Sequence, residues 1–195
     1  MKMLIPQKLT TFLLNPVARS IANRNLWAYV AIAFNRVDAE RLKLVGPDRL
    51  CAEWVLKNGG AIEFSEIAGR FIKDYNVLPP EGNKLTVKSI DASNSSIMRI
   101  GLDHLIGCKK IDNVILHQCK HLESGSLSGL LHIQNTLKFL QVSGCDNFSD
   151  EDFEVLGNLK VLEKLTIADM KYVKNIESVI QKLRTALPNC NVINE

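Results

Sequence analysis

The chain has no acidic side chain before Asp38, although its 195 residues include 21 aspartates and glutamates against 24 lysines and arginines. Lys2, Lys8, Arg19 and Arg24 fall within the first 24 residues, and subtracting these four from the formal charge of +3 leaves a body of −1. A near-neutral body lacks the basic face that displaces counterions from phosphates. The sequence therefore predicts no nucleic-acid binding.

Long apolar runs and paired cysteines are missing as well. A transmembrane helix needs roughly 18 to 20 apolar residues, and the longest candidate here is the short stretch LWAYVAIAF at residues 26–34. We therefore expect any membrane association to be peripheral. The five cysteines are an odd number without paired spacing, which argues against a secreted disulfide framework and favours free thiols in a reducing compartment.

Catalytic motifs are also lacking. The chain contains no phosphate-cradling glycine loop, no paired-histidine zinc-protease motif and no nucleophile-elbow serine. His117, Cys119 and His121 lie close together in sequence, but a zinc site would need a fourth ligand. Because no nucleophile, base and orienting group can be placed together, we predict that the protein is not an enzyme.

Residues 1–24 have the composition of a mitochondrial transit peptide. They are basic, hydroxylated and free of acids, and Leu4, Leu9, Phe12 and Leu13 could form one apolar side of a helix. The alternative is a basic N-terminus of a cytosolic protein. We predict a transit peptide over 1–24, followed by a helical domain over 25–84.

The helical domain carries clear start and stop residues. Asp38 can cap a helix over 39–45, and Pro47 suits the first turn of a second helix over 47–57. Asn58, Gly59 and Gly60 end this second helix, because glycine adopts the left-handed conformation without a side-chain penalty. A strand is expected over 61–64.

From residue 85 onward the chain repeats itself. Its central inward residues are predicted to be Ile90, Leu116, Val142, Ile167 and Val192, separated by 26, 26, 25 and 25 residues. With the apolar residues two and five positions before each, and with Ser93, Cys119, Cys145 and Met170 three positions after, the pattern is close to L-x-x-L-x-L-x-x-C/N; Lys88 departs most from it. This pattern is typical of leucine-rich repeats. An alternative is an ordinary α/β domain with evenly spaced strands.

Each repeat is expected to make one strand and to return through a helical segment. Ser149 with Asp152 resembles a capping box, and Asn175 can cap a helix that presents Ile176, Val179, Ile180 and Leu183 on one face. We predict an α/β fold: a short leucine-rich-repeat solenoid of four to five repeats over 85–195, capped by the N-terminal helices.

The outward positions of the strands predict a partner-binding face. They are Val87, Ser89, Asp91, Asn113, Ile115, His117, Phe139, Gln141, Ser143, Lys164, Thr166 and Ala168. Ile115 and Phe139 are apolar where a solvated face would be polar, so Ile115, His117 and Phe139 are candidate contact residues. The alternative is that the N-terminal part or a loop covers them. Cys119 and Cys145 fall in the inward column, which favours structural packing over redox chemistry.

Several stretches also resemble a known family. Residues 26–64, the segment KDYNVLP and the segment IDASNSSIMRIGLDHL are similar to mitochondrial coupling factor B, also called ATP synthase subunit s. The resemblance extends from residue 26 to the C-terminus, and its most specific part is the GPDR-x-x-x-EW segment over 46–54. It implies a small helical domain joined to a leucine-rich-repeat domain.

The resemblance further implies a Mg²⁺ site. Carried over by position, its ligands are Gly59 and Ser93, where the family has threonine. Serine keeps the hydroxyl oxygen that a hard cation prefers, and two protein ligands would leave the ion mostly hydrated and weakly held. The family's C-x-C dithiol is half present, because His117 replaces its first cysteine and Cys119 matches its second.

The function implied by the resemblance is a regulatory coupling factor. It would lie peripherally on the matrix side of the mitochondrial inner membrane, associate with ATP synthase and limit proton leak through the membrane sector. A related family member assembles the membrane arm of respiratory complex I, so an assembly factor is the alternative. A leucine-rich-repeat substrate adapter of a ubiquitin ligase is a further alternative. The sequence leaves a homo-oligomer open.

Overall fold

The computed structural model describes residues 29–194. The predicted transit peptide at 1–24 lies outside the described residues. The chain from Asn35 onward forms a compact unit separate from the residues before it, and residues 29–35 are helical. The boundary predicted between residues 84 and 85 stays a prediction.

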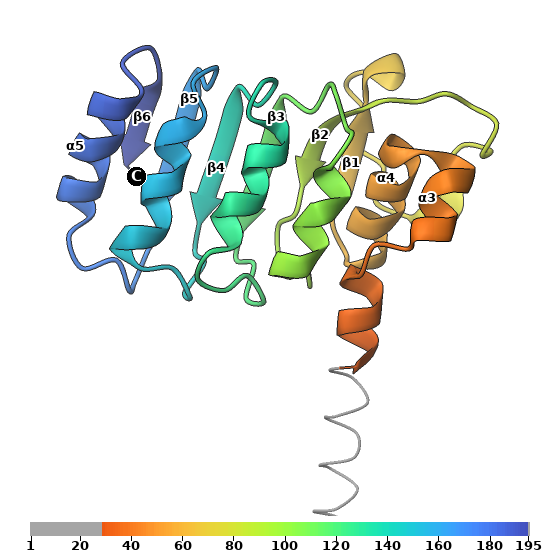
Figure 1. Cartoon of the computed structure of the whole chain (residues 1–195), viewed down its shortest axis with the longest axis horizontal. Coiled ribbons are helices and arrows are strands. Elements are labelled where there is room, and N and C mark those ends of the chain that lie inside the picture. Colours follow the sequence, from red (N-terminus) through yellow and green to blue (C-terminus); the bar gives the residue numbers. More distant parts are fainter. Residues whose placement is uncertain (1–28, 195) are drawn as a thin grey trace, which may run out of the picture. The chain divides into compact units, whose positions relative to one another are not determined.

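One sheet organises the unit that starts at Asn35 (Figure 1). Within the described range it has six strands in chain order: β1 (Ala61–Phe64), β2 (Val87–Asp91), β3 (Asn113–His117), β4 (Phe139–Ser143), β5 (Lys164–Ala168) and β6 (Asn191–Asn194). β1 pairs antiparallel with β2, whereas β2 to β6 are parallel. The predicted α/β class is confirmed, and the structure adds that its sheet is mainly parallel.

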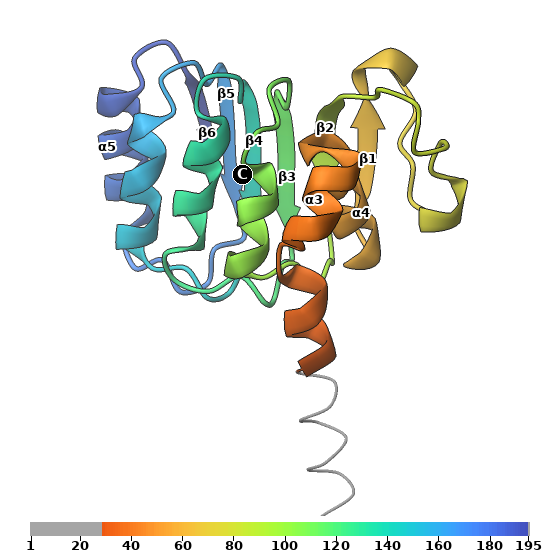
Figure 2. The same ribbon diagram turned by 45° about the vertical axis from the view of Figure 1, so that its right-hand side comes forward.

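The helical segments cover one face of this sheet, as Figures 1 and 2 show from two directions. They are α3 (Ala39–Val45), α4 (Pro47–Lys57), the 3-10 helices η3 (Arg99–Leu105), η4 (Ser126–Ile133) and η5 (Asp150–Asn158), and α5 (Ile176–Ala186). Two short 3-10 turns, η1 (Ser65–Ile67) and η2 (Tyr75–Val77), lie between β1 and β2 in the chain. We call the opposite face of the sheet the strand-presented face.

Local capping chemistry sets the helix boundaries. The Asp38 carboxylate accepts bonds from the amides of Glu40 and Arg41, both at 3.0 Å, and α4 begins at Pro47 as predicted. Ser149 and Asp152 form the predicted capping box, and the Asn175 side chain caps α5. These predictions are confirmed because each depends on residues within one helical turn.

The register of the first and last parallel strands corrects the predicted repeat alignment. Ile90 pairs with Val114, not with Leu116, and Val192 pairs with Leu165, not with Ile167. The buried column is thus Ile90, Val114, Leu140, Leu165 and Val192, at spacings of 24, 26, 25 and 27 residues. Lys88 then aligns with Asp112, and the Asp112 amide donates to the Lys88 carbonyl. Lys88 therefore does not belong to the buried apolar column and does not depart from it.

The same two-residue shift affects the predicted positions of Val87 on β2 and of Ser93 after it, and Ser89 is covered by a neighbouring strand. Val87 aligns with the buried Ile111 and is itself buried, so it does not face outward. Ser89 does lie on the strand-presented face, but its hydroxyl donates to the Glu63 carboxylate of β1 at 2.8 Å and it is covered. Ser93 leaves the cysteine column, where buried Ser95 takes its place beside Cys119.

Candidate functional site

The end of α4 meets the turn after β2, and this junction contains both predicted cation ligands. The Asn58 carbonyl accepts the Ser96 amide at 2.8 Å, while Ala61 pairs with Asp91 in the sheet. Gly60 must be glycine, because a Cβ there would lie 2.9 Å from the Asp91 carbonyl oxygen. Gly59 itself has a φ of +86° and is exposed, as expected for a residue that ends a helix.

Asp91 is the residue of this junction that sequence reasoning missed. Its Oδ1 accepts both the amide of Ser93 at 2.9 Å and the hydroxyl of Ser93 at 2.5 Å. Both side chains are half-buried. The oxygen donors on these two segments include the Gly59 carbonyl, the Ser93 hydroxyl and the Asp91 carboxylate, and oxygen donors of this kind suit Mg²⁺. The D-x-S spacing at 91–93 could have pointed to Asp91.

The residues present therefore fit a hydrated Mg²⁺ ion better than a metal held in a protein cage. In the part of the chain that the structure describes, no three histidine, cysteine, aspartate or glutamate side chains gather closely enough to hold a metal. An ion at this junction would take its remaining ligands from water, which is the usual way in which proteins bind Mg²⁺.

A buried amide fixes the two sides of the junction relative to each other. Asn35 donates from Nδ2 to the Asn58 side chain at 2.9 Å and to the Ser96 carbonyl at 3.1 Å. Its Oδ1 accepts from the Trp54 indole at 3.1 Å and from the Met98 amide at 2.9 Å. Because Asn35 is fully buried, these bonds form in a low-dielectric setting that strengthens them. The sequence spacing of 35, 58 and 96 gave no hint of this cluster.

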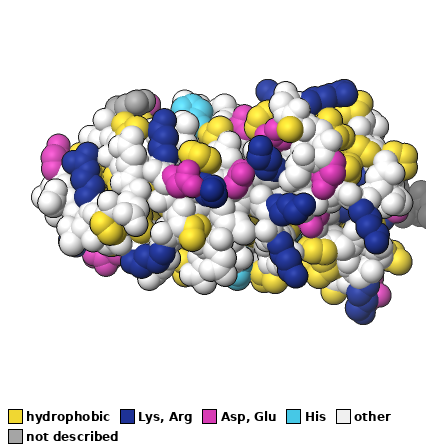
Figure 3. Space-filling view, turned by 90° about the horizontal axis from the view of Figure 1, so that it is seen from above, with side chains coloured by type: hydrophobic (Ala, Val, Ile, Leu, Met, Phe, Trp, Pro, Cys, Tyr) yellow, Lys and Arg dark blue, Asp and Glu magenta, His cyan; other side chains and the backbone are white. Residues whose placement is uncertain are grey.

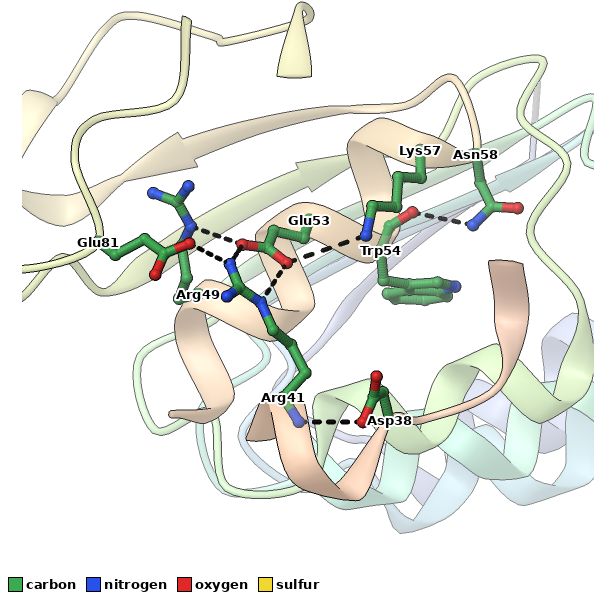
Figure 4. A network of polar contacts seen from close by, with 8 residues as sticks. All are labelled: Asp38, Arg41, Arg49, Glu53, Trp54, Lys57, Asn58 and Glu81. Carbon is green, nitrogen blue, oxygen red and sulfur yellow. Dashed lines mark hydrogen bonds and ion pairs between the residues drawn. The ribbon is translucent and has the colours of Figure 1, made fainter. Parts of the chain in front are cut away.

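A buried carboxylate holds α3 against α4 beside the junction (Figure 4). Glu53, 1% exposed, accepts hydrogen bonds from Arg41 and Arg49 and lies 3.9 Å from the Lys57 ammonium. Arg41 also pairs with Glu81, and Arg49 donates to the Pro79 carbonyl. Burial would raise the pKa of Glu53, but the bonds from Arg41 and Arg49 outweigh it and leave this pKa below its ordinary value.

The predicted partner residues lie together on the strand-presented face. Asn113 pairs with Phe139, Ile115 with Gln141 and His117 with Ser143, so Ile115, His117 and Phe139 occupy two neighbouring strands. Phe139 is 41% exposed, and Ile115 and His117 are half-buried. Asp91 pairs directly with Ile115. The predicted cation ligand Ser93 therefore follows the strand that adjoins the predicted partner face.

Ser143 links the side chains of His117 and Gln141. Its hydroxyl accepts from Gln141 Nε2 at 2.9 Å and lies 2.8 Å from His117 Nδ1. This arrangement fixes the His117 ring on the sheet surface.

The cysteines of the repeat pattern are packed away from this face. Cys119 and Cys145 are fully buried, and the Cys119 thiol donates to the Ala92 carbonyl at 3.0 Å. The neighbouring Cys145 thiol, followed by burial, raises the pKa of Cys119 well above its ordinary value. Both cysteines therefore pack in the core, as their inward column predicts.

No protein-family model matches the chain. Individual proteins do match. The chain is 33% identical over 180 residues to mouse "ATP synthase subunit s, mitochondrial", and the aligned region covers 90% of each of the two chains. The human protein of the same name is 34% identical over 174 residues, covering 87% of this chain and 86% of its own; the bovine one is 33% identical over 171 residues, covering 86% and 85%. The chain belongs to the mitochondrial ATP synthase subunit s family. The family resemblance seen in the sequence is confirmed.

The subunit s match extends over most of the described unit, including the α4 end, the Asp91 turn and the strand-presented face. None of the helices within residues 29–194 has the length and apolar character needed to cross a bilayer.

Proposed function

We propose that the chain is a non-catalytic accessory factor of the mitochondrial proton-transporting ATP synthase, acting peripherally on the matrix side of the inner membrane. In this role it limits proton leak through the membrane sector of the synthase and so supports coupled ATP synthesis. The observation that carries the proposal is the similarity to proteins named ATP synthase subunit s over about nine-tenths of both chains.

The repeated units are leucine-rich repeats in this proposal, and together they make a short solenoid with a helical N-terminal cap. The support is the column of buried residues at spacings of 24 to 27, each on a parallel strand, with a helical return between each strand and the next. Such a solenoid binds partners through the surface that its strands present.

The contact with the synthase is made by the face around Ile115, His117 and Phe139. Phe139 is exposed, and the residues beside it on this face are polar or half-buried. An aromatic side chain that becomes buried on binding is a frequent energetic centre of protein interfaces. His117 contributes a polar group to this face, and the buried Ser143 hydroxyl holds its ring in place. A dithiol is not needed for such a contact, because Cys119 lies in the core.

Mg²⁺ is the proposed cofactor, held by Gly59, Ser93 and Asp91 with water completing its shell. The bound ion would supply positive charge that ties the end of α4 to the turn after β2. Because Asp91 pairs with Ile115, an ordered Asp91 turn also orders one margin of the partner face.

Membrane potential in particles depleted of the endogenous factor tests the contact. We expect the parent chain to restore the potential and the Ile115→Ser/Phe139→Ser double variant to lose this effect. Cys119→Ser should restore it, at some cost in thermal stability. Val161→Ser/Tyr172→Ser, which changes two exposed apolar residues elsewhere, is the matched control and should behave as the parent.

The opposite pattern, restoration by the Ile115/Phe139 variant but not by Cys119→Ser, would put the thiol at the centre of the mechanism. Affinity purification from mitochondria separates the proposal from its alternative. Synthase subunits should co-purify with the chain, whereas recovery of complex I membrane-arm subunits in their place would identify an assembly factor.

A further inference from the structure

Apolar and basic side chains alternate along the segment that follows β1. Phe71, Tyr75 and Val77 are 41%, 37% and 53% exposed although they lie within seven residues of one another. Arg70 and Lys73 are exposed between and beside them. We call residues 68–78 the edge segment; Figure 2 shows it at the end of the sheet, beyond β1.

The edge segment is anchored to the sheet. Ile62 and Ile72 exchange two backbone hydrogen bonds of 3.0 and 2.8 Å, and the Ile72 side chain is buried. Side chains alternate in extended chain, so Phe71 and Lys73 point away from the core on either side of Ile72. The Gly69 amide donates to the Glu63 carboxylate at 2.6 Å and fixes the start of the segment.

Its second half is held equally well. The Asp74 carboxylate caps the turn η2 through the Asn76 amide at 2.8 Å, and the Lys57 ammonium lies 5.2 Å from the centre of the Tyr75 ring. Tyr75 and Val77 are therefore presented to solvent by an ordered turn. An ordered surface that exposes three large apolar side chains is typical of a surface that binds a partner or a membrane.

The charges around the apolar residues favour an anionic partner. Lys57, Arg70 and Lys73 lie on or beside the edge segment, so its three cations outnumber the two nearby carboxylates, Asp74 and Glu66, which accept hydrogen bonds and keep their negative charge. Figure 3 shows Lys and Arg side chains denser toward the right-hand end of the molecule, interspersed with hydrophobic ones.

We propose that the edge segment docks onto the surface of an anionic phospholipid bilayer, with Phe71, Tyr75 and Val77 entering the headgroup region and Lys57, Arg70 and Lys73 facing lipid phosphates. Tyrosine, lysine and arginine suit this boundary, because each combines an apolar body with a hydroxyl or a charge that stays hydrated, while phenylalanine and valine supply wholly apolar groups. The assignment rests on the proposed location at the inner membrane, but it concerns lipid and not the synthase.

Flotation with lipid vesicles tests the proposal without any synthase subunit present. The protein is purified from mitochondria, so that its N-terminus is in its native state, and mixed with vesicles of phosphatidylcholine alone or with one-third phosphatidylglycerol. We expect binding to the anionic vesicles that weakens as salt rises, because exposed charges are screened. Phe71→Ser/Val77→Ser and Arg70→Glu/Lys73→Glu should each lower the bound fraction about tenfold.

The matched control is Val161→Ser/Tyr172→Ser, which also replaces two exposed apolar residues but away from the edge segment. It should float as the parent does, and far-ultraviolet circular dichroism should be the same for all variants. Failure of the parent to float, equal flotation of the edge variants and the parent, or an equal loss in the control would overturn the proposal. Such a failure would leave the proposed synthase contact standing, since that contact is measured separately in depleted particles.

Discussion

Asp91 gives the proposed cation site a ligand with a full negative charge. We predict that Ser93→Ala weakens Mg²⁺ binding about tenfold and that Asp91→Asn weakens it at least as much, because Asp91 also orients the Ser93 hydroxyl. Isothermal calorimetry with MgCl₂ measures the affinity. Ser96→Ala, which changes an exposed serine of the same loop, is the control. Unchanged affinity in Ser93→Ala would remove Ser93 from the ligand set.

Glu53 is a buried charge whose partners cannot be lost without cost. We predict that Glu53→Gln lowers the free energy of unfolding by about 3 kcal/mol, because two arginines would remain directed at a neutral group. Glu40→Gln, which breaks the exposed pair with Lys43, should change it by less than about 0.5 kcal/mol. Urea unfolding at neutral pH gives both values.

The same residue predicts a pH dependence. Because the pKa of Glu53 is lower in the folded than in the unfolded chain, its contribution is fully present above the unfolded value of about 4.3 and is lost as pH falls through the folded value. We expect the stability difference between the parent and Glu53→Gln to shrink over this acidic range. A difference that stays constant down to the lowest pH would contradict the lowered pKa.

At the scale of elements, η3 packs against α4 without room for a methyl group. A Cβ on Gly101 would lie 2.4 Å from Asn35 Oδ1 and 2.5 Å from Trp54 Nε1. We predict that Gly101→Ala destabilises the protein by about 2 kcal/mol or more, since the buried amide and the indole would have to move. Gly82→Ala, which meets nothing within 4 Å, should be near neutral. Thermal unfolding of the two variants makes the comparison.

Element boundaries could be read from the sequence wherever one helical turn contains the cause. The side chains of Asp38 and Asn175 accept hydrogen bonds from amides two or three residues away, and Pro47 needs no partner for the amide hydrogen that it lacks. Their helices begin where predicted. The strands themselves were also predictable, because buried apolar residues alternate along them.

Strand register could not be read in the same way. A slip of two residues returns each side chain to the same face of the sheet, so alternation cannot distinguish Ile90 opposite Val114 from Ile90 opposite Leu116. The candidate site has the same limit. Gly59 and Ser93 came from family position, whereas Asn35 and Asp91 join it through contacts between segments that no local spacing reveals.

For the whole molecule, the acid-free N-terminus makes a prediction of its own. If residues 1–24 are a transit peptide, N-terminal sequencing of the protein from mitochondria should begin near residues 19 to 26. The six strands of the described sheet all lie after Asn35. Recovery of intact Met1 from the matrix would count against cleavage. A chain expressed without residues 1–24 and found in the cytosol would support their role as an address.

The strands lie side by side in the order in which they occur in the chain. A polypeptide that emerges N-terminus first, from a ribosome or through a narrow channel, can therefore place β1 and β2 together before β3 exists. Each later strand then pairs with the strand made just before it, and no strand has to wait for a partner that lies further along the chain. The Glu53 cluster lies between Arg41 and Glu81 and is complete before the first parallel pair. Folding can keep pace with delivery, because each new strand adds to the one growing edge of the sheet while β1 stays at the other edge.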